Sequence, residues 1–139
     1  MTPPPGFVDL QLNGFAGIDF SAPGLALDDV RATVAALVQR GTVAFCPTIV
    51  TAPLDVYDRN LPVLARAMAA PDLRAHLPGI HLEGPFISPH DGPRGAHPKE
   101  HVRAPDPALL THWQDLAHGH IRLLTLAPEL DGARELIRT

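Results

Sequence analysis

Residues 80–86 of this 139-residue chain read IHLEGPF, a short apolar run that ends in a carboxylate and is followed at once by a Gly-Pro pair. Because side chains alternate along an extended strand, His81 and Glu83 are predicted to share one face. The Gly-Pro pair predicts that the strand ends at Glu83. An imidazole and a carboxylate at one strand end can bind a divalent metal, position a water or bind a polar substrate, and they can also form a plain ion pair.

Strand and helix patterns alternate outward from this stretch. The predicted strands cover about residues 7–12, 42–46, 78–83 and 121–126, and Pro47 is expected to end the second of them. The predicted helices cover about residues 28–40, 54–70, 106–117 and 132–138, and Pro62 is expected to kink or split the second helix. This order is typical of parallel βα units in an α/β fold, and four units make half of a TIM (β/α)8 barrel of about 250 residues.

Polar residues at the ends of the predicted strands define a candidate site. In barrels of this kind the functional side chains lie at the carboxyl ends of the strands. Gln11 and Asn13 end the first predicted strand, and His81 and Glu83 end the third, so all four are predicted to face one mouth of the barrel. For Gln11 and Asn13, a turn-forming role before Gly14 explains the residue types equally well.

Four sequence motifs carry a family resemblance. They are PPGFVDLQLNG at residues 4–14, GTVAFCPTIVT at 41–51, LPGIHLEGPFISP at 77–89 and GAHPKEHV at 95–102. In this order and at these distances the chain resembles the N-acetylglucosamine-6-phosphate deacetylase family of the amidohydrolase superfamily. The resemblance implies one partial, truncated barrel domain over residues 1–139, the N-terminal half of the barrel, without the small β-sandwich that flanks the barrel in this family.

The resemblance also implies roles for particular residues. It carries Glu83 to the metal-binding carboxylate and Ala96 and His97 to substrate contacts, while Gln11, Asn13 and His81 are residues that could line the site. The implied cofactor is a divalent metal, zinc, iron or similar, which would polarise the amide carbonyl and activate a water. The family's two histidine ligands and its aspartate general base would lie beyond Thr139. No catalytic residue is therefore predicted within the chain, and the isolated chain is expected to be inactive.

The implied function is metal-dependent hydrolysis of N-acetylglucosamine 6-phosphate to glucosamine 6-phosphate and acetate in amino-sugar catabolism. The alternative is a catalytically inactive truncated product or interaction module that keeps the half-barrel for packing only. Another amidohydrolase, such as a dihydroorotase-like enzyme, fits less well, because the first strand has Gln11-x-Asn13 where that group keeps His-x-His. The pair His118 and His120 repeats the His-x-His spacing, but it precedes a strand and so lies at the opposite end of the barrel.

Composition narrows the partners and the compartment. The chain has a net charge of −4 and is 45% hydrophobic, which predicts one soluble globular domain. Its eleven basic residues form no stripe, so neither a nucleic-acid nor a membrane partner is predicted. The single cysteine, Cys46, excludes an internal disulfide and indicates a cytoplasmic protein. The remaining expected partners are an amino-sugar phosphate substrate and, for the full-length parent protein, further copies of itself in a homo-oligomer.

Overall fold

The computed structural model describes residues 6–138, so Pro4 and Pro5 of the first motif lie outside the described residues. Four parallel strands form one sheet in the order β1-β4-β5-β6. These strands are β1 (Phe7–Leu12), β4 (Thr42–Val50), β5 (Ile80–Glu83) and β6 (Ile121–Thr125). The helices are α1 (Leu27–Val38), α2 (Leu54–Ala69), α3 (Pro107–Leu116) and α4 (Ala133–Leu136), with a 3-10 helix η1 (Lys99–His101) before α3. The predicted α/β fold of four βα units with parallel strands is confirmed.

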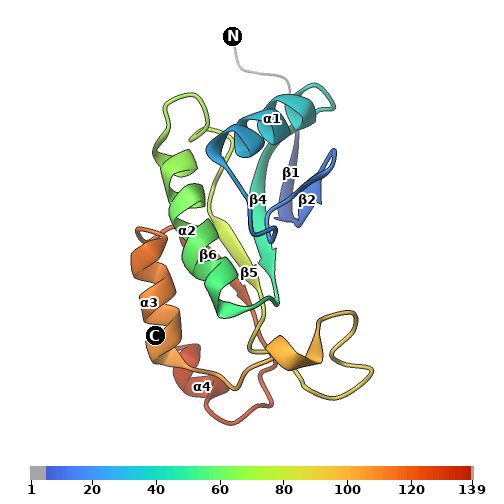
Figure 1. Ribbon diagram of the computed structural model, residues 1–139, viewed down its shortest axis with the longest axis vertical. Coiled ribbons are helices and arrows are strands. Elements are labelled where there is room, and N and C mark those ends of the chain that lie inside the picture. The colour runs from blue at the N-terminus through green and yellow to red at the C-terminus, as the bar shows by residue number, and fades with distance from the viewer. Residues whose placement is uncertain (1–5, 139) are drawn as a thin grey trace.

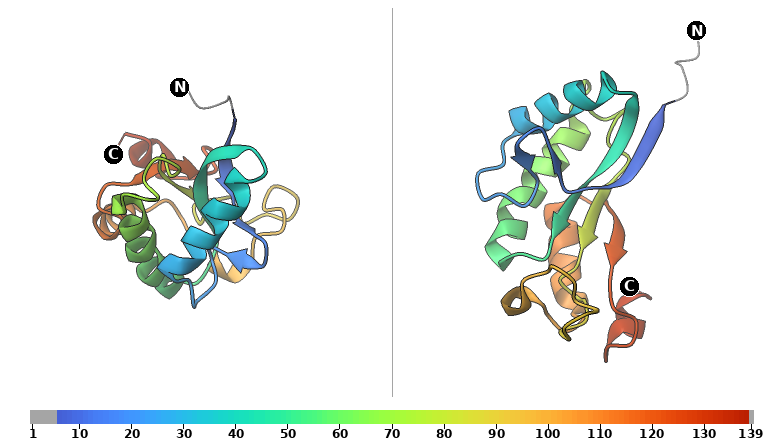
Figure 2. Two further views of the ribbon diagram at one scale, coloured as in Figure 1. Left: turned by 90° about the horizontal axis from the view of Figure 1, so that it is seen from above. Right: turned by 90° about the vertical axis from the view of Figure 1, so that its right-hand side faces the viewer.

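The sheet carries its helices on one side. Helices α1 and α2 cover one face of the sheet, and α3 lies beside α2 (Figure 1). Figure 2 shows that no described helix covers the opposite face. Large apolar side chains fill the space between the two layers, among them Phe45, Ile49, Leu61 and Leu82, each at most 1% exposed. The hydrophobic effect of burying these side chains therefore holds the helices and the sheet together.

Aromatic packing fixes the chain that follows β5. The ring of Trp113 on α3 stacks on Tyr57 of α2 with 4.2 Å between ring centroids, and on Phe86 with 5.9 Å. All three side chains are fully buried. Such aromatic pairs add about 0.5–1.5 kcal/mol each beyond the area they bury. The start of the loop after β5 is thereby anchored to two helices, which places the loop beyond the carboxyl ends of the strands (Figure 1).

The expected strand end at Pro47 and the expected split of the second helix at Pro62 are wrong. Strand β4 does not end at Pro47 but continues to Val50, and Thr48–Val50 pair with His81–Glu83 of β5. Pro47 is tolerated because it lies opposite Leu12, just past an irregularity in the β1–β4 register, where a missing N–H breaks no regular ladder. Helix α2 runs unbroken through Pro62 and is not split.

A small hairpin between β1 and α1 was not predicted. It consists of β2 (Gly14–Phe15) and β3 (Ile18–Asp19) in antiparallel pairing. The chain after it is fixed to α2, because the side-chain amide of buried Asn60 donates to the carbonyl oxygens of Phe20 (2.8 Å) and Ala22 (2.9 Å). The hairpin and this anchor hold the segment that follows Asn13 in place.

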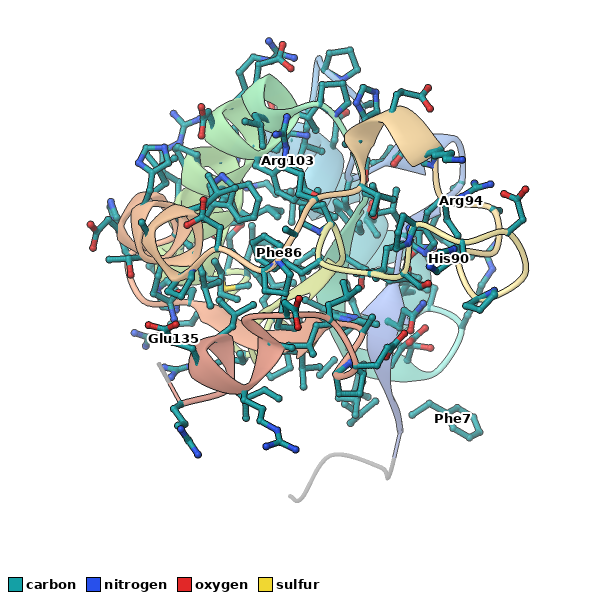
Figure 3. All side chains as sticks on the ribbon, turned by 90° about the horizontal axis from the view of Figure 1, so that it is seen from below. Phe7, Phe86, His90, Arg94, Arg103 and Glu135 are labelled. Carbon is teal, nitrogen blue, oxygen red and sulfur yellow. The ribbon has the colours of Figure 1, made fainter. Side chains whose placement is uncertain are left out.

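The β1 edge of the sheet is apolar and uncovered. Phe7, Val8 and Leu10 are 77%, 57% and 56% exposed, and Phe7 projects away from the body of the molecule (Figure 3).

Cys46 on the neighbouring strand is buried, as expected for a small core residue, and burial raises the pKa of its thiol. No helix within residues 6–138 has the length and hydropathy that crossing a bilayer requires.

Candidate functional site at the carboxyl ends of the strands

A pocket of about 230 Å³ lies at the carboxyl ends of β1, β4 and β5, lined by Asn13, Val50, Glu83, Ala96 and His97. Asn13 directly follows β1, and Val50 and Glu83 are the last residues of β4 and β5. Ala96 and His97 come from the long loop after β5, which folds back over these strand ends. Four of the six residues named from the sequence, Asn13, Glu83, Ala96 and His97, therefore meet in one pocket.

The imidazole of His97 faces the carboxylate of Glu83 across this pocket. His97 Nε2 lies 3.7 Å from Glu83 Oε1, and the two side chains are 19% and 18% exposed. The loop that carries His97 is held by Arg94, whose guanidinium donates to the His97 carbonyl oxygen and to the carboxylate of Asp91. Arg94 and His90 lie on this loop, on the same side of the molecule (Figure 3). The positive charge of Arg94 thus stabilises the loop conformation.

His81 lies below the pocket and does not line it. It is 5% exposed, its Nε2 lies 2.8 Å from Thr125 Oγ1, and its Nδ1 lies 3.4 Å from Thr48 Oγ1. Burial lowers the pKa of His81, and the nearby charge of Glu83 acts in the opposite direction. His81 therefore cross-links β5 to both neighbouring strands as a neutral imidazole.

Gln11 and Asn13 have different surroundings although they lie two residues apart. Gln11 is exposed and is not among the pocket-lining residues, and its backbone N–H donates to the carboxylate of Asp9 at 2.9 Å. Asn13 lines the pocket, and its carbonyl oxygen accepts a hydrogen bond from the N–H of Phe20 at 3.0 Å. A turn-forming role was considered for both residues. Asn13 can combine such a role with lining the pocket, whereas Gln11 does not line it.

Thr51, which sequence reasoning missed, contacts the ring of His97 and the backbone of Glu83. It is 2% exposed, its Oγ1 lies 3.0 Å from His97 Nδ1, and the same oxygen lies 3.4 Å from the backbone carbonyl oxygen of Glu83. The position of Thr51 directly after β4 is the signal that could have revealed it. Because the strand was expected to end at Pro47, Thr51 was not recognised as the residue that follows it.

Gly84 leaves the space that Thr51 occupies. Gly84 has a φ of +96°, and a Cβ at this position would collide with Thr51 Oγ1. Gly92 has a similar φ of +93°, but a Cβ added there would have no atom within 4 Å, so it offers a matched control. We expect Gly84→Ala to destabilise the fold by about 2 kcal/mol or more, and Gly92→Ala by about 1 kcal/mol. Urea unfolding of the two variants measures the difference, and equal losses would show that the contact with Thr51 has no energetic weight.

The donors in this pocket do not make a complete metal site by themselves. Among residues 6–138, no group of three or more His, Cys, Asp or Glu side chains is placed to hold a metal ion. A catalytic zinc usually takes three protein ligands. Glu83 has the chemistry of one such ligand. A larger hollow of about 470 Å³ along α3, β6 and α4 is lined mainly by leucine and isoleucine side chains, and the candidate chemistry lies in the smaller pocket.

Comparison with known proteins agrees with the motifs. No family model matches the chain. The N-acetylglucosamine-6-phosphate deacetylases of Bos taurus and Bacillus subtilis are 43% and 39% identical to it over 143 and 138 residues. These matches cover 96% of this chain but only 33% and 34% of the two relatives.

Solved structures give the same result. A mutant N-acetyl-D-glucosamine-6-phosphate deacetylase from Mycobacterium smegmatis, in complex with N-acetyl-D-glucosamine-6-phosphate, matches with a TM-score of 0.82 and 37% identity. The enzyme from Pasteurella multocida matches with a TM-score of 0.81 and 28% identity. Each match covers 96% of this chain and 33% or 34% of the other. Over almost its whole length, the chain is thus similar in sequence and fold to the N-acetylglucosamine-6-phosphate deacetylases, and it spans about a third of their length.

Proposed function

We propose that this chain supplies one wall of the active site of a metal-dependent deacetylase that hydrolyses N-acetylglucosamine 6-phosphate to glucosamine 6-phosphate and acetate. The observation that carries the proposal is the meeting of Glu83 and His97, 3.7 Å apart, in a pocket at the carboxyl ends of parallel strands. Polar groups in this position serve catalysis in enzymes built on such barrels. The relatives that match the chain over these residues are named for this reaction.

Three of the five residues that line the pocket have proposed roles. Glu83 contributes one carboxylate ligand to a divalent metal, zinc, iron or similar, since carboxylate oxygen is an ordinary ligand for such ions. His97 binds the substrate by a hydrogen bond from its ring, and Ala96, which also lines the pocket, contacts the substrate. Both side chains are more than four-fifths buried, which strengthens their electrostatic interaction with a polar substrate.

Some parts of the proposal rest on the sequence alone. The cytoplasmic location, the absence of nucleic-acid and membrane partners and the homo-oligomeric state of the full-length parent stay predictions. The substrate class rests on the relatives, one of which was solved in complex with N-acetyl-D-glucosamine-6-phosphate.

A chimera tests the proposed function. Residues 6–138 replace the matching third of the Bacillus subtilis relative, to which the chain is 39% identical. We expect the purified chimera to release acetate from N-acetylglucosamine 6-phosphate, and we expect a chelator to remove this activity. The unmodified relative is the positive control. A folded, metal-loaded chimera that releases no acetate would contradict the proposed function.

The alternative function, an interaction module without catalysis, is favoured by one observation only. Strand β1 lies at an edge of the sheet and exposes three large apolar side chains, Phe7, Val8 and Leu10. Exposed apolar edge strands are ready sites for pairing with another chain. An inactive chimera together with stable self-association of the 139-residue chain would favour this alternative.

A further inference from the structure

A buried hydroxyl group lies directly behind the candidate site. Thr51 Oγ1 carries one hydrogen and has two acceptors within reach. One is Nδ1 of His97 at 3.0 Å, and the other is the backbone carbonyl oxygen of Glu83 at 3.4 Å. The choice between them decides which ring nitrogen of His97 bears the hydrogen, because a neutral imidazole has one donor nitrogen and one acceptor nitrogen.

Two physical arguments select the same arrangement. The contact with His97 Nδ1 has ordinary hydrogen-bond length, whereas 3.4 Å to the Glu83 carbonyl is long. If Thr51 instead donated to that carbonyl and accepted from the ring, Nδ1 of a neutral His97 would carry the hydrogen and Nε2 would present a lone pair. That lone pair would face the Glu83 carboxylate oxygen at 3.7 Å, which is an unfavourable meeting of two electron-rich atoms.

We propose that Thr51 is a positioning residue that donates its hydroxyl hydrogen to His97 Nδ1 and thereby fixes His97 as the tautomer with the hydrogen on Nε2. The Nε2–H then points into the pocket beside Glu83 as a donor for an acceptor oxygen of the substrate. The tautomer stands on the geometry of the chain, and its use in substrate binding rests on the proposed function.

The neighbours of Thr51 and His97 restrict the positions of the hydroxyl group and the ring. Its side chain lies against Gly84, where any Cβ would collide with Oγ1. Arg94 holds the backbone of His97 from the other side of the residue, through the His97 carbonyl oxygen. Thr51 thus fixes the ring of His97, and Arg94 fixes its backbone. A bound substrate therefore meets a ring that is already in position.

Nitrogen NMR of the 139-residue chain tests this assignment without any need for turnover. The chain is labelled with 15N at histidine, and His97→Gln assigns the two His97 ring signals. At a pH at which the spectrum shows a neutral His97 ring, we expect Nε2 to be protonated and Nδ1 to show the signature of an unprotonated nitrogen that accepts a hydrogen bond.

Three variants separate positioning from general structure. Thr51→Ser keeps the hydroxyl and should keep the Nδ1 signature, whereas the isosteric Thr51→Val should lose it and change the tautomer ratio on the order of 10-fold. Thr48→Val is the matched control, because Thr48 on the same segment of chain contacts His81 instead, so the His97 signals should not move.

The NMR experiment tests the tautomer of His97, and acetate release by the chimera tests the proposed function, so the failure of one can be told from the failure of the other. A hydrogen on Nδ1 in the unsubstituted chain would overturn the assignment even if no variant folds, and so would a Thr51→Val variant with unchanged His97 signals. An inactive chimera would contradict the proposed function while leaving the tautomer measurement intact.

Discussion

Replacing Glu83 by glutamine in the chimera is expected to lower kcat/KM for acetate release on the order of 1,000-fold or more and to reduce the metal content of the purified protein. Glutamine has nearly the same shape as glutamate but no negative charge, so it is a much weaker ligand for a divalent ion. The rest of the pocket should persist, because glutamine leaves the backbone of residue 83 paired with both neighbouring strands, at Val50 of β4 and Thr125 of β6. Steady-state kinetics and elemental analysis of the same preparation measure the two effects.

The control for this substitution is Glu100→Gln. Glu100 is an exposed glutamate on η1, outside the pocket lining. The substitution Glu100→Gln removes the same charge without touching the site. The activity and metal content of this variant should therefore match those of the unsubstituted chimera. Full metal content and full activity in Glu83→Gln would remove Glu83 from the metal site.

Local sequence signals were sufficient for most of the fold. The helix predicted over about residues 106–117 is α3, and it begins as its sequence favours: Pro107 is its first residue, and the side chain of Asp106 accepts a hydrogen bond from the N–H of Leu109 at 3.0 Å. The apolar runs at β5 and β6 predicted parallel strands, which the pairing confirms. Strand β5 is mostly buried, whereas β6 is mostly half-buried or exposed. Prolines were the misleading signal. Their local effect is to break strands and helices, but Pro47 lies at a register irregularity and Pro62 within a helix packed along its length.

The site was harder to predict because it depends on how a loop returns. Alternation along β5 placed His81 and Glu83 on one face, yet His81 is buried between Thr48 and Thr125 and only Glu83 reaches the pocket. The spacing of apolar residues and the amino-acid composition cannot show that a loop brings His97 back over the strand ends. The prediction of His97 as a site residue came from the family resemblance. Thr51 was missed since its importance depends on a contact with a residue 46 positions away.

The second large effect concerns the chain by itself, which is expected to show no deacetylase activity with zinc, iron or another divalent ion. The described residues bring one carboxylate, Glu83, and one imidazole, His97, to the pocket, together with the neutral amide of Asn13. Residues 6–138 contain no cluster of three or more potential metal ligands. A metal-dependent hydrolase needs more ligands than this, as well as a group that delivers a proton to the leaving amine.

Acetate release by the purified 139-residue chain and by the chimera, measured side by side with the same metal and substrate, tests this account most directly. The account predicts chelator-sensitive release by the chimera and no release above background by the chain alone. Release of acetate by the chain alone at an enzyme-like rate, removed by a chelator, would contradict it, because the pocket of Glu83 and His97 would then be a complete site.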